Sequence, residues 1–337
     1  AGGASSARMH AESLYDSRFI WLDFLPIFDK SDIDNTFSAL IQNIYRYAVG
    51  GKNQGLATWP QGKRMAAFVS QDVDQHFSLA NDTAEVFIKN RVPISWYTLG
   101  NLANQNHYLT KKLSGAGEVA CHGDDYKTFS ELDYHEQHTD LSHCKETLSS
   151  IIKHEVLGFR PPNEAVNKNT YKAIESAGLD YLFARVDSSN GLPLIWRVNN
   201  REIVQLPRIN SNGFNLWSEK SLNLEESISQ LSLELAWIKR AGALFNFSFR
   251  TTSMLDKTHL RVIEALTQQL VDPDIHIDTA GGVATWWLYR NTLLNQRGKP
   301  NLDEITDERL DRFQPYWLET TESGEINRSP LTKSALN

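Results

Sequence analysis

Short apolar runs alternate with longer amphipathic segments along most of this sequence, and this alternation limits the possible folds most strongly. The apolar runs have the length of buried strands and lie at residues 65–70, 92–99, 118–121, 158–160, 181–184 and 243–249. The amphipathic segments have the apolar spacing of helices and lie at residues 83–89, 102–113, 136–153, 167–177, 224–239 and 259–269. The alternation predicts parallel strands joined by helical crossovers, as a barrel or as an open doubly wound sheet.

Both architectures place functional residues at the C-terminal ends of the strands. The polar side chains found at these ends are Asp72, Asp74, His122, Arg160 and Arg250. No glycine-rich phosphate loop follows any of the strands, which argues against a nucleotide-binding fold.

The N-terminal region predicts a strand at residues 19–25 and a helix at residues 31–47 that ends before Gly50 and Gly51. One strand and one helix cannot bury their own apolar faces, so they must lean on the following domain or end another one. A polar linker follows them. We therefore expect an N-terminal extension at residues 1–55, a barrel at 56–300 and a C-terminal extension at 301–337.

Charge and cysteine content exclude several classes of function. Lys and Arg number 34 against 41 Asp and Glu, a net charge of −7, and no basic run is present. Nucleic acid is therefore not an expected partner. No apolar run is long enough for a transmembrane segment. Cys121 and Cys144 form no CxxC motif, so we expect two buried free thiols, with a single disulfide as the alternative.

Asp72 and Asp74 follow the first strand of the alternating region. In an extended chain their side chains point the same way. Two adjacent carboxylates repel each other, so the pair suggests a bound cation, or a base next to a metal ligand. The alternative is an Asp-rich turn at the end of a strand.

His122 and Arg160 follow two further strands. A histidine after a buried strand, beside Gly123 and nearby acids, suits a metal ligand, although such a histidine can also be an ordinary hydrogen-bonded one. Two prolines after Arg160 fix the exit of the chain and suit an arginine that orients a carboxylate, with a structural turn as the alternative. Further histidines on the predicted helix at residues 136–153 and just before it are interpreted as a solvated or partly buried face.

In order and spacing, these segments resemble the NodB-homology polysaccharide deacetylases of carbohydrate esterase family four. The resemblance extends from about Trp59 to Tyr289 and includes the segments SQDVD, CHGDDY and FRPP and the strand FNFSF. It implies an α/β fold of the irregular (β/α) barrel type. It also implies metal-dependent hydrolysis of N-acetyl or O-acetyl groups on a bacterial polysaccharide, a reaction at non-peptide carbon–nitrogen bonds in the N-acetyl case.

The resemblance assigns roles to individual residues. Asp72 would be the general base, Arg160 would tether that base, and Asp74 and His122 would bind a divalent metal, zinc in many members. Two positions depart from the family, because Tyr126 stands where a second histidine ligand is expected and Arg250 stands where the histidine acid is expected. Asp125, or its neighbour Asp124, could supply a further oxygen ligand. Arg250 stays protonated near neutral pH, so its expected role is to stabilise an oxyanion or to bind an anionic sugar.

These departures leave three hypotheses. The chain is a deacetylase with an altered site, an inactive deacetylase-fold domain that binds polysaccharide or has a structural role in exopolysaccharide handling, or another metal-dependent C–N hydrolase on the same barrel. The resemblance implies a polysaccharide or oligosaccharide partner and a periplasmic or extracellular location. Residues 19–47 also resemble the last strand and helix of a glutamine-amidotransferase-like domain, which would make the chain a fragment of a larger exopolysaccharide protein.

Overall fold

The computed structural model describes residues 9–14, 17–22, 54–185, 191–293, 307–320 and 326–331. The chain forms two compact units. One is Lys63–Tyr289, and the other combines Ala1–Gly62 with Arg290–Asn337. The alternating region of the sequence lies in the first of these.

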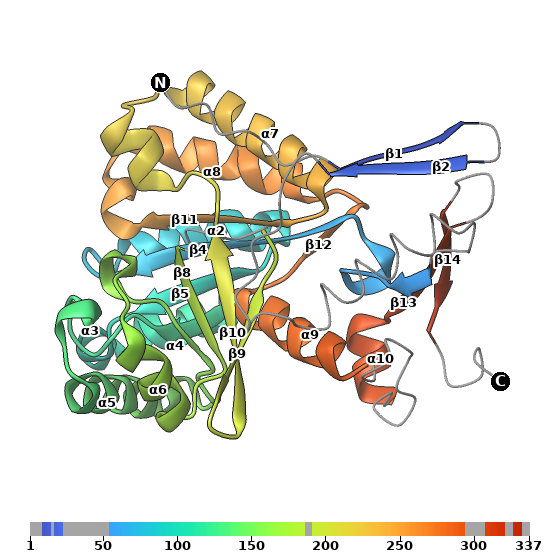
Figure 1. Ribbon diagram of the computed structural model, residues 1–337. Helices are drawn as coiled ribbons and strands as arrows, with labels where there is room; N and C mark the ends of the chain where they lie inside the picture. Colours follow the sequence, from blue (N-terminus) through green and yellow to red (C-terminus); the bar gives the residue numbers. More distant parts are fainter. Residues whose placement is uncertain are drawn as a thin grey trace. The chain divides into compact units, whose positions relative to one another are not determined.

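A nine-stranded, largely parallel sheet forms the centre of the Lys63–Tyr289 unit (Figure 1). Its strands follow the order β11-β4-β5-β6-β7-β8-β10-β9, and β12 also pairs with β4. All pairs are parallel except β9 with β10. The strands are β4 (Met65–Val73), β5 (Ile94–Thr98), β6 (Glu118–Cys121), β7 (Gly158–Phe159), β8 (Tyr181–Arg185), β9 (Leu194–Val198), β10 (Arg201–Arg208), β11 (Leu244–Arg250) and β12 (Ile275–Ile277).

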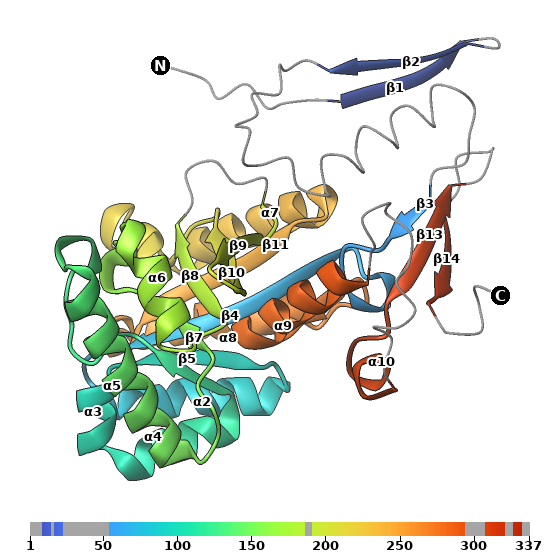
Figure 2. The same ribbon diagram turned by 60° about the horizontal axis from the view of Figure 1, so that its bottom comes forward.

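Helices cover the outside of this sheet (Figure 2). They are α2 (Leu79–Asn90), α3 (Gly100–Gln105), α4 (His107–Ala116), α5 (Tyr134–Ile152), α6 (Lys168–Ser176), α7 (Leu224–Ala241), α8 (Lys257–Leu270) and α9 (Ala280–Thr292). The crossovers between the parallel strands run through them, as the alternation predicted. Capping boxes define where several begin: in α5, the Asp133 side chain accepts from the Glu136 backbone and the Glu136 side chain accepts in return.

Two features of this unit differ from the sequence prediction. The single helix expected at residues 102–113 is two helices, because Asn106 has a non-helical backbone conformation between α3 and α4. Strands β9, β10 and β12 were not predicted. Pro207 and Gln205 interrupt the apolar pattern of β10, and no residue of β9 is fully buried.

The sheet curls into an irregular barrel whose last gap is bridged by asparagine side chains. Strands β10 and β11 share no ladder of backbone hydrogen bonds. Instead, the Asn246 amide donates to the carbonyl of Pro207 at 2.8 Å, and the Asn210 amide donates to the carbonyl of Asn246 at 2.5 Å. Buried backbone groups at a sheet edge need such partners. The predicted α/β fold, a distorted barrel, is confirmed.

The other unit contains two small antiparallel sheets, a short α-helix and a 3-10 turn (Pro60–Gly62) among its described residues. Strand β1 (Met9–Leu14) pairs with β2 (Ser17–Leu22). Strand β13 (Tyr316–Thr320) pairs with both β3 (Gln54–Leu56) and β14 (Ile326–Pro330), and the helix is α10 (Asp307–Phe313). The strand predicted at residues 19–25 corresponds to β2, although its last three residues lie outside the described part of the chain. The helix predicted at residues 31–47 lies outside it altogether.

Two further observations concern residues that the structure describes. Cys121 and Cys144 are buried, and both have free thiols. None of the helices in the described ranges is long and apolar enough to cross a membrane.

Candidate active site

The polar residues predicted at the strand ends gather at one end of the barrel. Asp72 lies near the end of β4, and its backbone is in register with Arg250, the last residue of the neighbouring strand β11. His122 and Arg160 follow β6 and β7. Their backbone N–H groups continue the sheet by donating to the carbonyls of Thr98 at 3.0 Å and Cys121 at 2.9 Å, respectively. Adjacent parallel strands therefore hold these side chains on rigid backbone.

A buried ion pair joins Asp72 to Arg160. The Nε of Arg160 donates to Oδ1 of Asp72 at 2.8 Å, and Nη2 donates to Oγ of Ser248 at 3.2 Å. Both charged side chains are less than 10% exposed, at 8% for Asp72 and 4% for Arg160. Burial opposes the charge on Arg160, but Asp72 and Glu164 outweigh it and raise the arginine's pKa further. The arginine predicted to orient a carboxylate is in contact with that carboxylate.

Asp74 and His122, the two predicted metal ligands, interact electrostatically and each has a buried atom without a hydrogen-bond partner. These atoms are Oδ1 of Asp74 and Nε2 of His122. The other ring nitrogen of His122, Nδ1, lies 2.7 Å from the carbonyl of Arg160. A carbonyl only accepts, so Nδ1 carries the proton and Nε2 presents its lone pair. Burial raises the pKa of Asp74 and lowers the pKa of His122, and each group partly offsets the shift of the other.

Tyr126, Arg250 and Asn163 form a second network beside Asp74. Nη2 of Arg250 donates to the Tyr126 hydroxyl at 2.5 Å and to Oδ1 of Asn163 at 3.2 Å. The Tyr126 hydroxyl in turn donates to Oδ1 of Asn163 at 2.9 Å. Nε of Arg250 lies 3.8 Å from Oδ2 of Asp74. Burial raises the pKa of Tyr126, so its hydroxyl stays neutral near pH 7.

The acidic residues after His122 turn toward other partners. Asp125 accepts from the Asn101 amide at 2.8 Å and lies 3.6 Å from Lys127. Asp124 accepts from the same amide at 3.1 Å and lies 2.8 Å from Nδ1 of His143 on α5. Asp125, the proposed extra ligand, is thus held by Asn101 and Lys127.

A zinc site of the family's kind needs three protein donors. Asp74 and His122 offer a suitable oxygen and nitrogen. The Tyr126 hydroxyl accepts a hydrogen bond from the positively charged Arg250, which also lies beside Asp74. Among the described residues, no group of three His, Cys, Asp or Glu side chains could hold a metal ion. A three-ligand zinc site therefore does not fit these residues.

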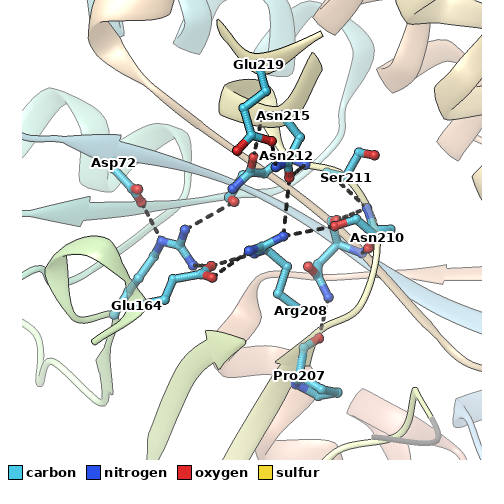
Figure 3. Close-up of polar contacts among 12 residues, drawn as sticks. Asp72, Glu164, Pro207, Arg208, Asn210, Ser211, Asn212, Asn215 and Glu219 are labelled. Carbon is cyan, nitrogen blue, oxygen red and sulfur yellow. Dashed lines mark hydrogen bonds and ion pairs between the residues drawn. The ribbon is translucent and has the colours of Figure 1, made fainter. Parts of the chain in front are cut away.

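The structure adds residues that the sequence did not reveal. Glu164 lies 3.0 Å from Nη1 of Arg160, and Arg208 binds both oxygens of Glu164 (Figure 3). Asn163 bonds to Arg250, as described above. The segment RPPNE places Glu164 four residues after Arg160, which was a usable signal. Arg208 had none, because β10 was not predicted.

Comparison with known sequences points to one family. The family model for polysaccharide deacetylase matches residues 73–182. This segment runs from the end of β4 to β8, and it includes Asp74, His122 and Arg160. A comparison with curated proteins gives no match.

Comparison with solved structures shows the same fold. A protein from Mycobacterium smegmatis assigned as a polysaccharide deacetylase superposes with a TM-score of 0.60 at 17% identity, over 69% of this chain and 93% of that one. A similarly assigned protein from Pseudomonas aeruginosa PAO1 gives 0.58 at 13% identity, over 67% and 91%. An allantoinase gives 0.59 at 12% identity, over 68% and 92%. The resemblance drawn from the motifs is therefore confirmed: residues 73–182 match the polysaccharide deacetylase model, and the chain has the fold of proteins assigned to that family.

Proposed function

We propose that this domain hydrolyses acetyl groups on a bacterial polysaccharide, with Asp72 as the general base. The observation that carries the proposal is the buried pair of Asp72 and Arg160, with 2.8 Å between Oδ1 and Nε. A general base must be held within reach of the water whose proton it takes. Arg160 occupies one carboxylate oxygen of Asp72 and thereby fixes the direction in which the other points.

Arg250 is the group we assign to the carbonyl oxygen of the acetyl group. In the family this charge comes from a metal, often zinc, but a three-ligand zinc site does not fit here. The Arg250 side chain is 40% exposed and lies beside Asp74, so a bound substrate can reach its guanidinium. Fixed donors that face a developing oxyanion lower the barrier to acyl transfer.

The leaving group then decides which acetyl linkage the site can hydrolyse. Arginine does not release a proton near neutral pH, so Arg250 cannot protonate a departing amine. An amide needs that proton before its C–N bond breaks, whereas an ester can release an alkoxide that takes its proton from water. Of the two acetyl linkages that the resemblance implies, the proposal therefore favours O-acetyl esters over N-acetyl amides.

Acetate release tests this proposal. The purified chain is incubated with O-acetylated and N-acetylated oligosaccharides, with and without a chelator. We expect release mainly from the ester, loss of release in Asp72→Asn, and full activity in Asp82→Asn, a surface control. Release that is indifferent to Asp72→Asn would remove the base assignment. Release that is abolished by chelation and restored by zinc would assign the carbonyl to a metal on Asp74 and His122 instead of to Arg250.

A second candidate is polysaccharide binding without hydrolysis. The observation in its favour is that Arg250 already contacts Tyr126, Asn163 and Asp74, so its charge is partly satisfied. Tyr126 is 41% exposed, and an exposed aromatic ring can stack on a sugar. Glycan binding that is weakened by Tyr126→Ala, without acetate release from any substrate, would favour this candidate.

A polysaccharide substrate would place the protein in the periplasm or outside the cell. Fractionation of cells that produce the complete protein tests this part of the proposal. Recovery in the cytoplasmic fraction alone would contradict it.

A further inference from the structure

Four charged side chains of alternating sign form a continuous row that begins at Asp72. Figure 3 labels three of them, Asp72, Glu164 and Arg208. Nε of Arg160 lies 2.8 Å from Oδ1 of Asp72, and Nη1 lies 3.0 Å from Oε1 of Glu164. Beyond Glu164, Nε and Nη2 of Arg208 donate to its two oxygens at 2.6 and 2.7 Å. The row crosses the barrel from β4 to β10.

Asp72 and Arg160 are buried, and the other two members of the row are largely shielded from solvent. The Glu164 and Arg208 side chains are 11% and 13% exposed, close to the values for Asp72 and Arg160. Burial raises the pKa of Glu164, but Arg160 and Arg208 outweigh it, so that its pKa lies below the usual value. Glu164 is thus a carboxylate bound on both sides by arginine. Buried charges persist in a protein where their partners are held in good geometry.

Arg160 has one partner at each of three nitrogens: Nε and Nη2 donate hydrogen bonds, and Nη1 forms an ion pair. These partners are Asp72 on β4, Ser248 on β11 and Glu164 in the loop after β7, respectively. A planar guanidinium that is held at three points has one orientation. Without Glu164, the Arg160 guanidinium keeps only its hydrogen bonds to Asp72 and Ser248, which lie on one edge of the group, and it can rotate about that edge.

The backbone around Glu164 supports this arrangement. Asn163 and Glu164 have φ values of +58° and +57°, a left-handed conformation that side chains other than glycine rarely adopt. Two prolines precede them, and η3 (Pro162–Glu164) forms a tight turn. Such strained residues persist where surrounding contacts hold them, and they gather at functional sites. Here the turn directs the Glu164 carboxylate to both arginines.

Arg208 connects the row to the loop after β10. Its Nη1 donates to the carbonyl of Asn210 at 3.2 Å and lies 3.5 Å from Oδ1 of Asn215. Asn215 belongs to the irregular helix η4 (Phe214–Glu219), and Asn210 bridges the gap in the barrel. The far end of the row is therefore anchored in the barrel wall.

We infer that Glu164 and Arg208 are positioning residues, which hold Arg160 in the orientation that directs Asp72 at its water molecule. The inference rests on the proposed hydrolysis for its kinetic consequence. Its structural content, that the orientation of Arg160 depends on Glu164 and Arg208, is independent of any reaction. A buried pair with only a stabilising role would affect folding and leave both the rate and the orientation of Arg160 unchanged.

The kinetic test compares Glu164→Gln and Arg208→Gln with Arg201→Gln. Arg201 is the matched control, because it begins the same strand and pairs with Asp180 at 2.6 Å away from the row. We expect kcat for acetate release to fall about 10- to 100-fold in the two row variants, as small misplacements of a catalytic group do, with KM little changed. Arg208→Lys should restore part of the rate. Wild-type kcat in folded Glu164→Gln and Arg208→Gln proteins would overturn the inference.

A second readout separates this inference from the proposed function. In a ¹H–¹⁵N spectrum, the Nε–H of Arg160 should give a shifted, slowly exchanging signal because it donates to buried Asp72, and Arg160→Lys identifies that signal. We expect Glu164→Gln and Arg208→Gln to shift or broaden it and Arg201→Gln to leave it in place. An unchanged signal in both row variants would refute the inference even if the protein releases no acetate. A changed signal in an inactive protein would sustain the positioning and refute the hydrolysis.

Discussion

Arg160→Met tests whether the strand-end site depends on one shared cation. Methionine keeps an apolar side chain over the Phe183 ring, whose centroid lies 4.4 Å from the Arg160 guanidinium carbon. It removes the ion pairs to Asp72 and Glu164 and the hydrogen bond to Ser248. The substitution thus isolates the loss of charge from the loss of packing.

The contacts of each carboxylate set the expected magnitude. Removal of one partner from a buried ion pair costs about 3–5 kcal/mol, because the other charge stays buried without compensation. Glu164 keeps both contacts to Arg208, so the main loss falls on Asp72. We therefore expect the lower end of the range, about 3 kcal/mol of unfolding free energy. Asp72→Asn in the same chain removes the uncompensated charge and should restore about 1–2 kcal/mol of it.

Urea unfolding at pH 7, followed by far-UV circular dichroism, measures these differences for the wild type, both single variants and the double variant. Arg201→Met is the control, because its 40% exposed side chain makes a surface ion pair worth at most about 1 kcal/mol. A loss below about 1 kcal/mol in Arg160→Met would refute the reasoning. Strict additivity of the Arg160 and Asp72 substitutions would refute it as well, because residues that share an ion pair must couple.

Three further predictions concern the barrel itself. Gly158→Ala should lower the free energy of unfolding by about 3 kcal/mol or more, because its new methyl group would lie 1.9 Å from the Tyr181 ring. In Gly115→Ala the new methyl group meets nothing within 4 Å, so this substitution should stabilise α4 by about 0.5–1 kcal/mol. Thermal unfolding measures both effects. Glu164 has a lowered pKa, so its stabilising effect is present above the ordinary value and is lost as pH falls through the folded one; Glu164→Gln should flatten the acid side of the stability profile. Burial raises the pKa of Glu118 in the folded protein, so its contribution to stability is full below the pKa of the unfolded chain and declines as pH rises through the folded pKa. Glu118→Gln should remove this decline in urea titrations between pH 4 and 8.

The parts of this fold that the sequence predicted are those whose signal is local. Strand β4 begins with the apolar run Met65–Val69, and all nine of its residues are buried. The sequence could also predict that the residues at the strand ends lie close together, because parallel strands of one sheet share their C-terminal edge. The contact of Arg160 with Asp72 is the direct result.

The unpredicted parts depend on contacts between residues distant in sequence. Strand β10 has charged ends and contains Gln205 and Pro207, so no apolar run marks it, yet its pairing with β8 stabilises it. Arg208 meets Glu164 across 44 residues of sequence. No periodicity in either segment encodes that contact. The break at Asn106 shows the converse, because a continuous helical pattern does not reveal a single residue that leaves the helical conformation.

The turn at Asn163 and Glu164 connects the two polar networks of the strand-end site. Asn163 belongs to the network of Arg250 and Tyr126, and Glu164 belongs to the row of Arg160 and Arg208. Replacing Arg250 with histidine would remove the permanent cation beside Asp74 and the hydrogen bond that Nη2 donates to the Tyr126 hydroxyl. Replacing Tyr126 with histidine would supply a donor but leave the cation in place, where it opposes a bound metal ion. Tyr126 and Arg250 are therefore linked in one hydrogen-bond network, and a substitution at either position changes the surroundings of Asp74.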